Sequence, residues 1–166
     1  MKAPLGAVRG VFHRAVPEAA VGHALEDGPS YTFQNRYNVA GRFGALYFGD
    51  RVEVCRATLE KRGLLPTRRL RFVLLSFEIR VDRVLDLGDP ATSDMLDIDR
   101  DDLVAPRGTA SAYRITQTIA AAAYDSGRIR GLLAPDATLA GNSLALYPAR
   151  LLTKDFVRHK DSKVLW

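Results

Sequence analysis

The sequence contains little cysteine, histidine or tryptophan, with one cysteine, three histidines and one tryptophan among its 166 residues. The single cysteine, Cys55, cannot form a disulfide within the chain. The histidines His13, His23 and His159 are scattered and show none of the spacings typical of metal ligands. We therefore expect neither a disulfide scaffold nor a metal site.

Long apolar runs are also absent. No stretch approaches the roughly 18 to 20 residues that a membrane-spanning helix needs. Residues 1–10 lack the continuous apolar segment of a signal peptide. We expect a soluble, cytoplasmic protein that makes no membrane contact.

Two phosphate-binding fingerprints are missing as well. The sequence holds neither a Gly-x-Gly-x-x-Gly motif nor a Walker motif. This absence argues against a Rossmann dinucleotide site and against a P-loop.

The composition that remains is that of an ordinary globular domain. Hydrophobic residues make up 47% and charged residues 26% of the chain, which is close to the globular average. A length of 166 residues suits one hydrophobic core. We expect a single domain over residues 1–166, with a polar C-terminal tail from about residue 150.

Charge is distributed unevenly along the chain, whose net charge is +5. Between residues 82 and 102 there are eight aspartates and two arginines. Basic residues form two short clusters, one of Arg68, Arg69 and Arg71 and one of Arg158, Lys160 and Lys163. Neither cluster is interleaved with aromatic residues, so we do not expect direct nucleic-acid binding. A basic nucleic-acid-binding module remains the weakest alternative, and a steep salt dependence of binding would reveal it.

Strand signals alternate with helix signals along the chain. The strand signals are β-branched and aromatic residues in short runs. They predict strands at residues 7–16, 41–48, 70–81, 83–87, 131–134 and 143–147, with 70–81 central or nearly so.

Helix signals are fewer. Val52, Cys55 and Leu59 share one face of an amphipathic helix over residues 51–62, which Gly63 ends. Residues 111–124 form the clearest helix, the acidic stretch after residue 90 is expected to be helical, and 18–35 to be a loop. The pattern is that of a mixed α/β or α+β domain with one mixed sheet.

Three segments together resemble the RES domain family, the toxin component of a bacterial toxin-antitoxin pair. The first is Arg36–Gly41 followed by Ala45–Phe48, which is similar to a Gly-Arg-aromatic-Asn-x-x-Gly and Ala-Leu-Tyr pattern. The second runs from Phe77 to Leu87 and ends in Leu-Asp-Leu. The third runs from Gln117 through Gly131–Pro135 to Asn142. They occur in the expected order and cover most of the chain.

The resemblance implies a fold similar to that of ADP-ribosyltransferases. It also implies an enzyme that degrades NAD, as substrate rather than cofactor, by cleaving the nicotinamide-ribose bond with phosphate or water as acceptor. The expected protein partner is an Xre-type helix-turn-helix antitoxin covering the NAD cleft. Assembly into a homo-oligomer is left open.

The resemblance also implies roles for several residues. Arg14 and Arg36 are the expected clamp on the pyrophosphate of NAD, because a guanidinium can bind such oxygens bidentately. Tyr47 is expected to stack on the nicotinamide. Asn142 could orient a ligand amide or hold the turn after Gly141.

Two positions depart from the family pattern. Eleven residues after Tyr47, where the family places a carboxylate, this sequence has Thr58, and where the family has serine it has Asp136. Helical geometry turns Glu60 about 160° away from Thr58, and Glu53 is similarly misplaced. Asp136 is therefore the candidate carboxylate, with Thr58 as its hydroxyl counterpart.

These departures leave two hypotheses open. In the first, Asp136 and Thr58 act as an exchanged pair and the enzyme cleaves NAD. In the second, the domain is catalytically impaired and binds NAD, another ADP-ribosyl compound or only the antitoxin. We expect Tyr37 to pack in the core, Cys55 to be inert and His13 to be structural.

Overall fold

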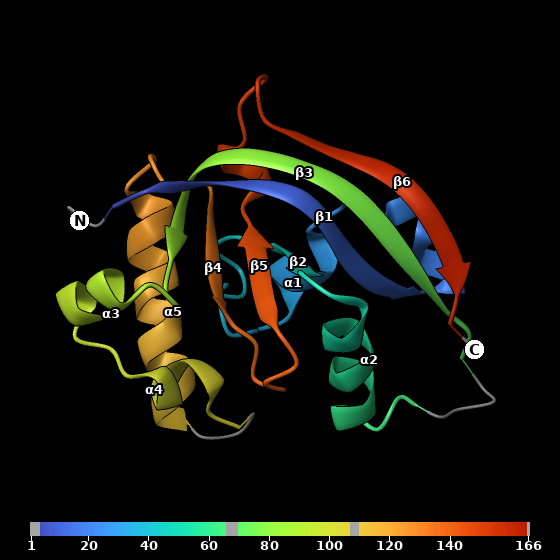
Figure 1. The fold of residues 1–166 in the computed structure, drawn as a ribbon, viewed down its shortest axis with the longest axis horizontal. Coiled ribbons are helices and arrows are strands. Elements are labelled where there is room, and N and C mark those ends of the chain that lie inside the picture. Colours follow the sequence, from blue (N-terminus) through green and yellow to red (C-terminus); the bar gives the residue numbers. More distant parts are fainter. Residues whose placement is uncertain (1–3, 66–69, 107–109, 166) are drawn as a thin grey trace.

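Six strands form the frame of the protein in the computed structural model, which describes residues 4–65, 70–106 and 110–165 (Figure 1). Arg68 and Arg69 of the first basic cluster lie outside these described residues. The strands are β1 (Gly6–Pro17), β2 (Leu46–Gly49), β3 (Phe72–Asp86), β4 (Gly131–Pro135), β5 (Asn142–Leu146) and β6 (Phe156–Val164).

The strands form one mixed sheet in the order β1-β2-β5-β4-β3-β6. β1 also pairs antiparallel with β3, so the first five strands close into a barrel and β6 extends the sheet beyond it. Only β3 and β4 pair in parallel. Because β3 pairs with β1, β4 and β6, the predicted central strand is central, and the predicted mixed α/β class is confirmed.

β3 is one strand where the sequence predicted two. Arg83, the first residue of the second predicted strand, has a left-handed φ of 59°. At the same place the register between β3 and β1 shifts, between Gly6 and Ala7 of β1. On its other edge β3 pairs with β6 up to Arg80 and with β4 from Val84 onward. The predicted break is a bulge at which β3 bends, so the ladder continues through it.

The C-terminal segment, expected to be a polar tail, contains β6, which pairs antiparallel with β3. Its residues Arg158–Val164 are exposed. A strand whose two faces both meet solvent shows no apolar alternation, which is why the sequence concealed it. The basic residues Lys160 and Lys163 on this edge disfavour pairing with another sheet.

Helices cover the barrel at its ends and on one side. The 3₁₀ segment η1 (Glu18–His23) and α1 (Gly28–Thr32) occupy the predicted loop. The predicted amphipathic helix is α2 (Val52–Lys61), although Val54 is buried and Val52 only half-buried. The remaining elements are α3 (Pro90–Leu96), α4 (Arg100–Val104), α5 (Ala110–Asp125) and the 3₁₀ segment η2 (Pro148–Arg150).

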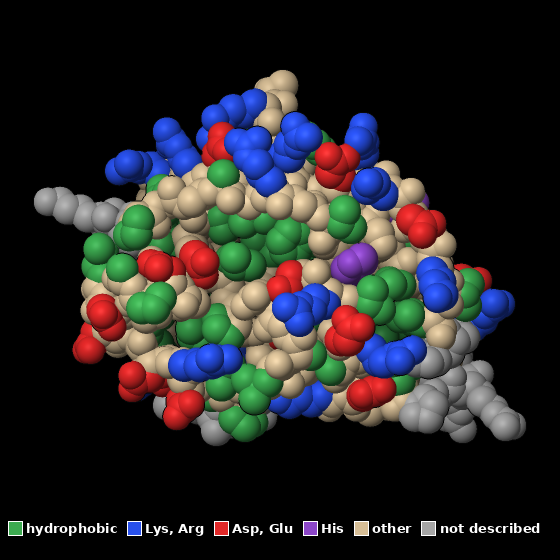
Figure 2. Space-filling view, in the orientation of Figure 1, with side chains coloured by type: hydrophobic (Ala, Val, Ile, Leu, Met, Phe, Trp, Pro, Cys, Tyr) green, Lys and Arg blue, Asp and Glu red, His purple; other side chains and the backbone are tan. Residues whose placement is uncertain are grey.

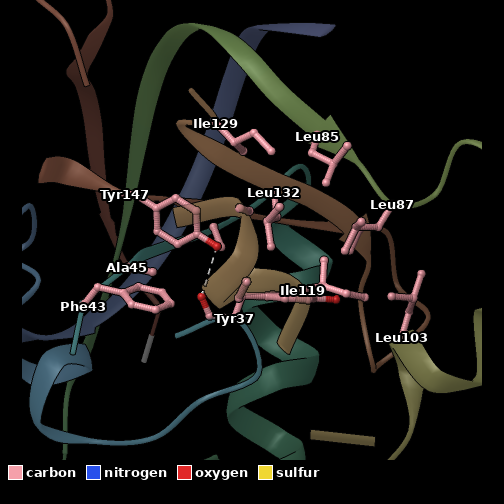
Figure 3. Close-up of a cluster of buried hydrophobic side chains, with 14 of the residues drawn as sticks. Tyr37, Phe43, Ala45, Leu85, Leu87, Leu103, Ile119, Ile129, Leu132 and Tyr147 are labelled. Atoms are coloured by element: carbon pink, nitrogen blue, oxygen red, sulfur yellow. Dashed lines mark hydrogen bonds between the residues drawn. The ribbon is translucent and has the colours of Figure 1, made fainter. Parts of the chain in front are cut away.

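Two large clusters of buried side chains make up most of the core. The first joins α4 and α5 to the sheet, with Tyr37, Phe43, Leu132 and Tyr147 among its members (Figure 3). The second fills the barrel with side chains from β1, β2, β3 and β5, among them Phe12, Phe48, Phe77, Leu144 and Leu146. Expected core residue Tyr37 is 2% exposed.

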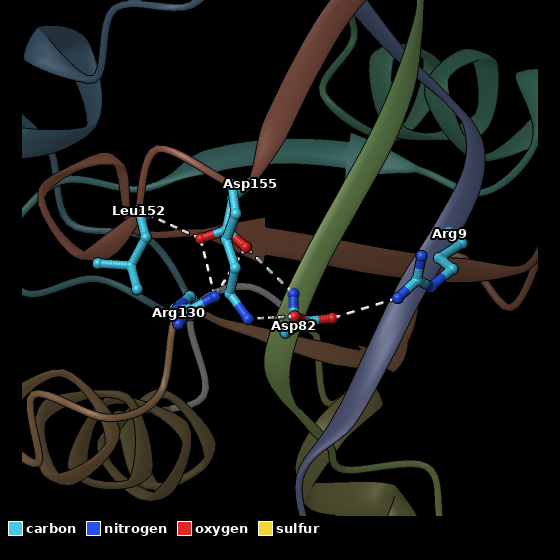
Figure 4. Close-up of polar contacts among 6 residues, drawn as sticks. Arg9, Asp82, Arg130, Leu152 and Asp155 are labelled. Atoms are coloured by element: carbon cyan, nitrogen blue, oxygen red, sulfur yellow. Dashed lines mark hydrogen bonds and ion pairs between the residues drawn. The ribbon is translucent and has the colours of Figure 1, made fainter.

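A buried ion pair fixes the chain before β6. The Arg130 and Asp155 side chains are 4% and 2% exposed, and Arg130 Nη1 donates to both Asp155 oxygens at 2.7 and 2.9 Å (Figure 4). Asp155 also accepts from the backbone N–H groups of Leu152 and Asp82, at 2.7 and 3.4 Å. Both charges are therefore paired inside the protein.

Charged side chains of opposite sign gather in different places on the surface. Figure 2 shows Lys and Arg along the edge over β3 and β6, and Asp and Glu over α3 and α4. On the β3–β6 side, Glu78 bonds to Arg158 and lies near Arg80, while Asp82 pairs with Arg9 and Lys154. None of the helices that the structure describes has the length and hydropathy of a membrane span.

Candidate functional site

A pocket of about 520 Å³ lies between the barrel, α2, the segment after α1 and the loop that joins β4 to β5. Of the six predicted site residues, the structure brings five to this pocket: Arg14, Arg36, Tyr47, Thr58 and Asp136. The sixth, Asn142, is not part of its lining.

Close packing of α2 on β2 shapes one wall of the pocket. A Cβ on Gly49, the last residue of β2, would lie 2.8 Å from Val54 Cβ and 3.1 Å from the Arg51 carbonyl oxygen. Glycine therefore permits α2 to approach the end of β2. Thr58 of α2 is part of the pocket lining.

Arg14 reaches the pocket from β1 with part of its guanidinium unpaired. Its Nη1 is buried and has no hydrogen-bond partner, and its Cζ lies 5.9 Å from the centre of the Phe48 ring. Burial lowers the pKa of Arg14, and the nearby Cys55 opposes this shift. Arginine stays charged in proteins, so the pocket holds a cationic donor without an acceptor.

Arg36 is tied to the protein more firmly. Its Nη1 and Nη2 donate to the carbonyl oxygens of Asp102 and Ala105, at 3.4 and 2.5 Å, and its Cζ lies 4.9 Å from the centre of the Tyr113 ring. A guanidinium has five N–H donors, so these two bonds leave others for a ligand. Arg36 thus both anchors the pocket wall and presents charge to it.

The Tyr47 hydroxyl is engaged in holding the same wall. It accepts from the backbone N–H of Tyr37 at 3.0 Å and donates to Asn38 Oδ1 at 2.9 Å. Asn38 Nδ2 in turn donates to the carbonyl oxygens of Ser30 and Phe33, at 2.5 and 3.0 Å. Burial raises the pKa of Tyr47, so the hydroxyl keeps its proton. Only the ring of Tyr47 is left for contact with a ligand.

Tyr37 combines the expected core packing with a second unpaired group. Its hydroxyl is buried without a hydrogen-bond partner, and Tyr37 also lines the pocket. Burial raises the pKa of Tyr37, which keeps this hydroxyl a donor. The ring extends toward Ile119 and Leu103 in the first core cluster (Figure 3), so this unpaired hydroxyl lies in the core.

Asp136 is buried and accepts three hydrogen bonds. Its Oδ2 accepts from the backbone N–H and the hydroxyl of Thr138, at 2.8 and 2.5 Å, and its Oδ1 accepts from the Ser143 hydroxyl. A carboxylate has about four acceptor positions, so one position remains. These donors hold a fixed negative charge at the pocket wall.

Sequence reasoning missed Ser143 and chose its neighbour Asn142. Asn142 Nδ2 and its backbone N–H donate to Asp50 at 2.8 Å each, which secures the turn after Gly141. Asn142 is not part of the pocket lining, and these bonds fit the second role considered for it, that of holding the turn. Successive residues of a strand point to opposite faces, so Ser143 lines the pocket where Asn142 does not. Ser143 supplies a hydroxyl near the position at which Asp136 replaces the family's serine.

The two other carboxylates considered for the site lie outside it. Glu53 and Glu60 are exposed and absent from the pocket lining, as their angular positions on the helix predicted. Arg62, at the end of the same helix, does line the pocket. The lining therefore includes three arginines, Arg14, Arg36 and Arg62, and a single carboxylate, that of Asp136.

His13 and Cys55 also line the pocket. The Nδ1 atom of His13 lies 3.0 Å from the Ser76 hydroxyl, and burial lowers the pKa of this histidine. Burial raises the pKa of the Cys55 thiol to about 11, so the thiol stays protonated at neutral pH. Among the residues that the structure describes, no group of His, Cys, Asp and Glu is arranged to hold a metal ion.

Comparison with known proteins identifies a sequence family and structures of similar fold. The sequence model of the family described as "RES domain" matches residues 11–163. A chain in the crystal structure of the M. tuberculosis MbcT-MbcA toxin-antitoxin complex has a similar fold, with a TM-score of 0.78 and 20% sequence identity. The match covers 97% of this chain and 86% of that chain. No curated protein sequence matches this chain.

Proposed function

Because the chain belongs to the RES domain family, we propose that it binds NAD in this pocket and cleaves the nicotinamide-ribose bond. The acceptor is phosphate or water. NAD is the substrate, and no other cofactor takes part in the proposed reaction.

The observation that carries this proposal is the buried donor Arg14 Nη1, which has no partner in the protein and belongs to a residue that lines the pocket together with Arg36 and Arg62. Leaving a buried polar group unpaired costs about 1–3 kcal/mol, and more for a charged group. A ligand with anionic oxygens and hydroxyls would remove that cost. A pyrophosphate joined to ribose offers both kinds of acceptor.

Asp136 supplies the charge that cleavage needs. In the proposed step the bond from ribose C1′ to the nicotinamide nitrogen breaks, and nicotinamide leaves with the bonding electrons. A phosphate or water oxygen then bonds to C1′, and a water acceptor loses its proton to solvent. The fixed Asp136 carboxylate stabilises the positive charge that develops on the ribose.

A second candidate function is NAD or ADP-ribose binding without cleavage. The commitment of both Asp136 oxygens to Thr138 and Ser143 favours it, as does Thr58 at the family's carboxylate position. In this case the pocket retains its clamp and lacks a carboxylate close enough to the ribose.

The biological role that we propose is that of a toxin neutralised by an antitoxin. The similarity of the fold to a component of a toxin-antitoxin complex supports this role. The proposed partner is an Xre-type protein that covers the pocket. Expression of the wild-type chain alone should arrest growth and lower cellular NAD, and Asp136→Asn should relieve both effects. Normal growth with unchanged NAD would favour the second candidate.

Purified protein incubated with NAD, with and without phosphate, tests the reaction directly when products are identified by mass spectrometry. We expect nicotinamide release by the wild type. Asp136→Asn keeps the shape and removes the charge, so kcat should fall by roughly 10²–10³, the range seen when one transition-state-stabilising group is lost, while ADP-ribose affinity changes little.

Ser143→Ala is the matched control, because it removes one hydrogen bond to Asp136 and keeps the carboxylate. It should retain far more activity than Asp136→Asn. An inactive wild type together with an active Thr58→Glu plus Asp136→Ser protein would reject the exchanged pair and establish the second candidate.

A further inference from the structure

Phe33 is an exposed aromatic residue on the lining of the pocket. It follows α1, and it is 68% exposed. A lone exposed apolar residue is ordinary on a protein surface. Phe33 differs because it lines a pocket to which Arg14, with its unpaired Nη1, also belongs, so its position rather than its exposure requires an explanation.

The backbone of Phe33 is held firmly for a loop residue. Its N–H donates to the Pro29 carbonyl oxygen at 3.0 Å, and its own carbonyl oxygen accepts from Asn38 Nδ2 at 3.0 Å and Asn35 Nδ2 at 3.3 Å. Asn38 is completely buried and also binds Tyr47. The exposed ring therefore extends from an anchored backbone.

The segment is also tied to α5 directly after Phe33. Gln34 Nε2 donates to Gln117 Oε1 at 2.6 Å, and Gln117 Nε2 donates to the Asn35 carbonyl oxygen at 2.8 Å. The backbone of this segment is therefore fixed before a ligand binds, so stacking on the ring would cost the freedom of the Phe33 side chain but not that of the loop.

The residues that line the pocket differ in how exposed they are. Asp136 is 8% exposed, whereas Phe33 is 68% exposed. If cleavage takes place beside Asp136, as proposed above, the part of the ligand far from the broken bond extends toward the open side. A flat aromatic ring there matches the face of a nucleobase, and base-aromatic stacking is largely independent of which base is bound.

We propose that Phe33 stacks on the purine base at the far end of the ligand, while the pocket arginines bind its diphosphate. The inference rests on the proposed NAD function and specifies the substrate class. The site takes nucleotides with an aromatic base on the side of the diphosphate away from the cleaved bond.

Calorimetry with three stable ligands tests this assignment: ADP-ribose and AMP, which contain adenine, and ribose 5-phosphate, which does not. Phe33→Ala should weaken binding of ADP-ribose and AMP by about tenfold, in keeping with the loss of one base-aromatic stack. It should leave ribose 5-phosphate binding unchanged. Phe33→Tyr keeps the ring and should bind all three ligands like the wild type.

Leu139 offers a matched control, since it is 65% exposed on the β4–β5 loop and does not line the pocket. Leu139→Ala should leave all three affinities unchanged. Because Phe33 is exposed, Phe33→Ala should melt at the wild-type temperature. A protein that melts there and binds ADP-ribose with wild-type affinity would overturn the stacking role.

The outcomes separate this inference from the proposed function. Turnover of NAD by both wild type and Phe33→Ala, with equal ADP-ribose affinity, would reject the stacking role of Phe33 and keep the proposed NAD cleavage. Binding of AMP that depends on Phe33, in a protein that neither binds nor cleaves NAD, would support stacking of the base on Phe33 and reject the proposed NAD cleavage. If Phe33→Ala weakened the binding of all three ligands equally, the stacking role would be rejected, because the loss of affinity would not depend on the base.

Discussion

Two arginines in this protein, the buried Arg130 and the half-buried Arg14, have opposite surroundings. Arg130 donates to both oxygens of Asp155 inside the fold (Figure 4), whereas Arg14 has a buried Nη1 that no protein group accepts from. Arg130 therefore has its counter-ion within the chain, and Arg14 faces a pocket that can admit one. The difference separates a charge that maintains the fold from a charge available for binding.

The physical costs of the two arrangements differ accordingly. A buried ion pair roughly balances its desolvation by mutual attraction, provided that its remaining hydrogen bonds are made. For Asp155 the backbone N–H groups of Leu152 and Asp82 meet that condition. Arg14 has the aromatic ring of Phe48 and the protonated Cys55 thiol nearby, and neither replaces an anion.

Removing the counter-ion of Arg130 should produce the largest effect on stability. Asp155→Asn leaves a buried guanidinium without a negative partner, so the free energy of unfolding should fall by about 3–5 kcal/mol. Urea denaturation followed by circular dichroism measures this change. A loss below about 1 kcal/mol would show that the pair is not needed for the fold.

The control for Asp155→Asn removes both charges together. Arg130→Met combined with Asp155→Leu should be more stable than Asp155→Asn alone, because no charge is left unpaired. Glu78→Gln, which affects the exposed pair with Arg158, should leave the denaturation midpoint nearly unchanged.

Arg14→Met should have a smaller effect of either sign. The substitution removes a half-buried charge whose buried Nη1 has no acceptor, so the unfolding free energy should stay within about 1 kcal/mol of the wild type or rise. The same denaturation experiment measures it. A loss as large as that of Asp155→Asn would mean that Arg14 is structural and would remove the contrast between the two arginines.

The sequence predicted the elements that bury apolar residues in a regular pattern. Strand β3 and helices α2 and α5 have such patterns, and the structure contains all three. The sequence pattern could not predict β6, whose residues Arg158–Val164 are exposed. That strand is held by backbone pairing with β3 and by the turn that Asp155 fixes. Pairing partners far along the chain leave no local signal.

The candidate site was predictable by residue type and less so by contact. The resemblance indicated Arg14, Arg36, Tyr47, Thr58 and Asp136, and the structure places all five on one pocket. The resemblance gave no indication that Arg36 donates to backbone carbonyl groups or that the Tyr47 hydroxyl donates to Asn38. The resemblance also did not indicate Ser143, which lines the pocket where its neighbour Asn142 does not, because successive strand residues face opposite sides.

The Cys55 thiol, near Arg14, gives a further test of burial at the pocket wall. Burial raises the pKa of Cys55 from 9.0 to about 11, so the reactive thiolate should be about a hundredfold scarcer at pH 8 than in an exposed cysteine. Alkylation by iodoacetamide, followed by mass spectrometry, should be slow in the folded protein and fast in urea. ADP-ribose should slow it further in the wild type and not in Arg14→Met. Equal rates in folded and unfolded protein would contradict the burial of this thiol.

The central claim is that the unpaired guanidinium of Arg14 is a ligand-binding charge, and calorimetric titration of ADP-ribose into wild type and Arg14→Met tests it most directly. A hydrogen bond to a charged group contributes about 1.5–3 kcal/mol, so we expect the Arg14→Met protein to bind ADP-ribose roughly 10 to 150 times more weakly while unfolding at the wild-type denaturant concentration. Equal affinity of the two proteins for ADP-ribose would contradict the claim.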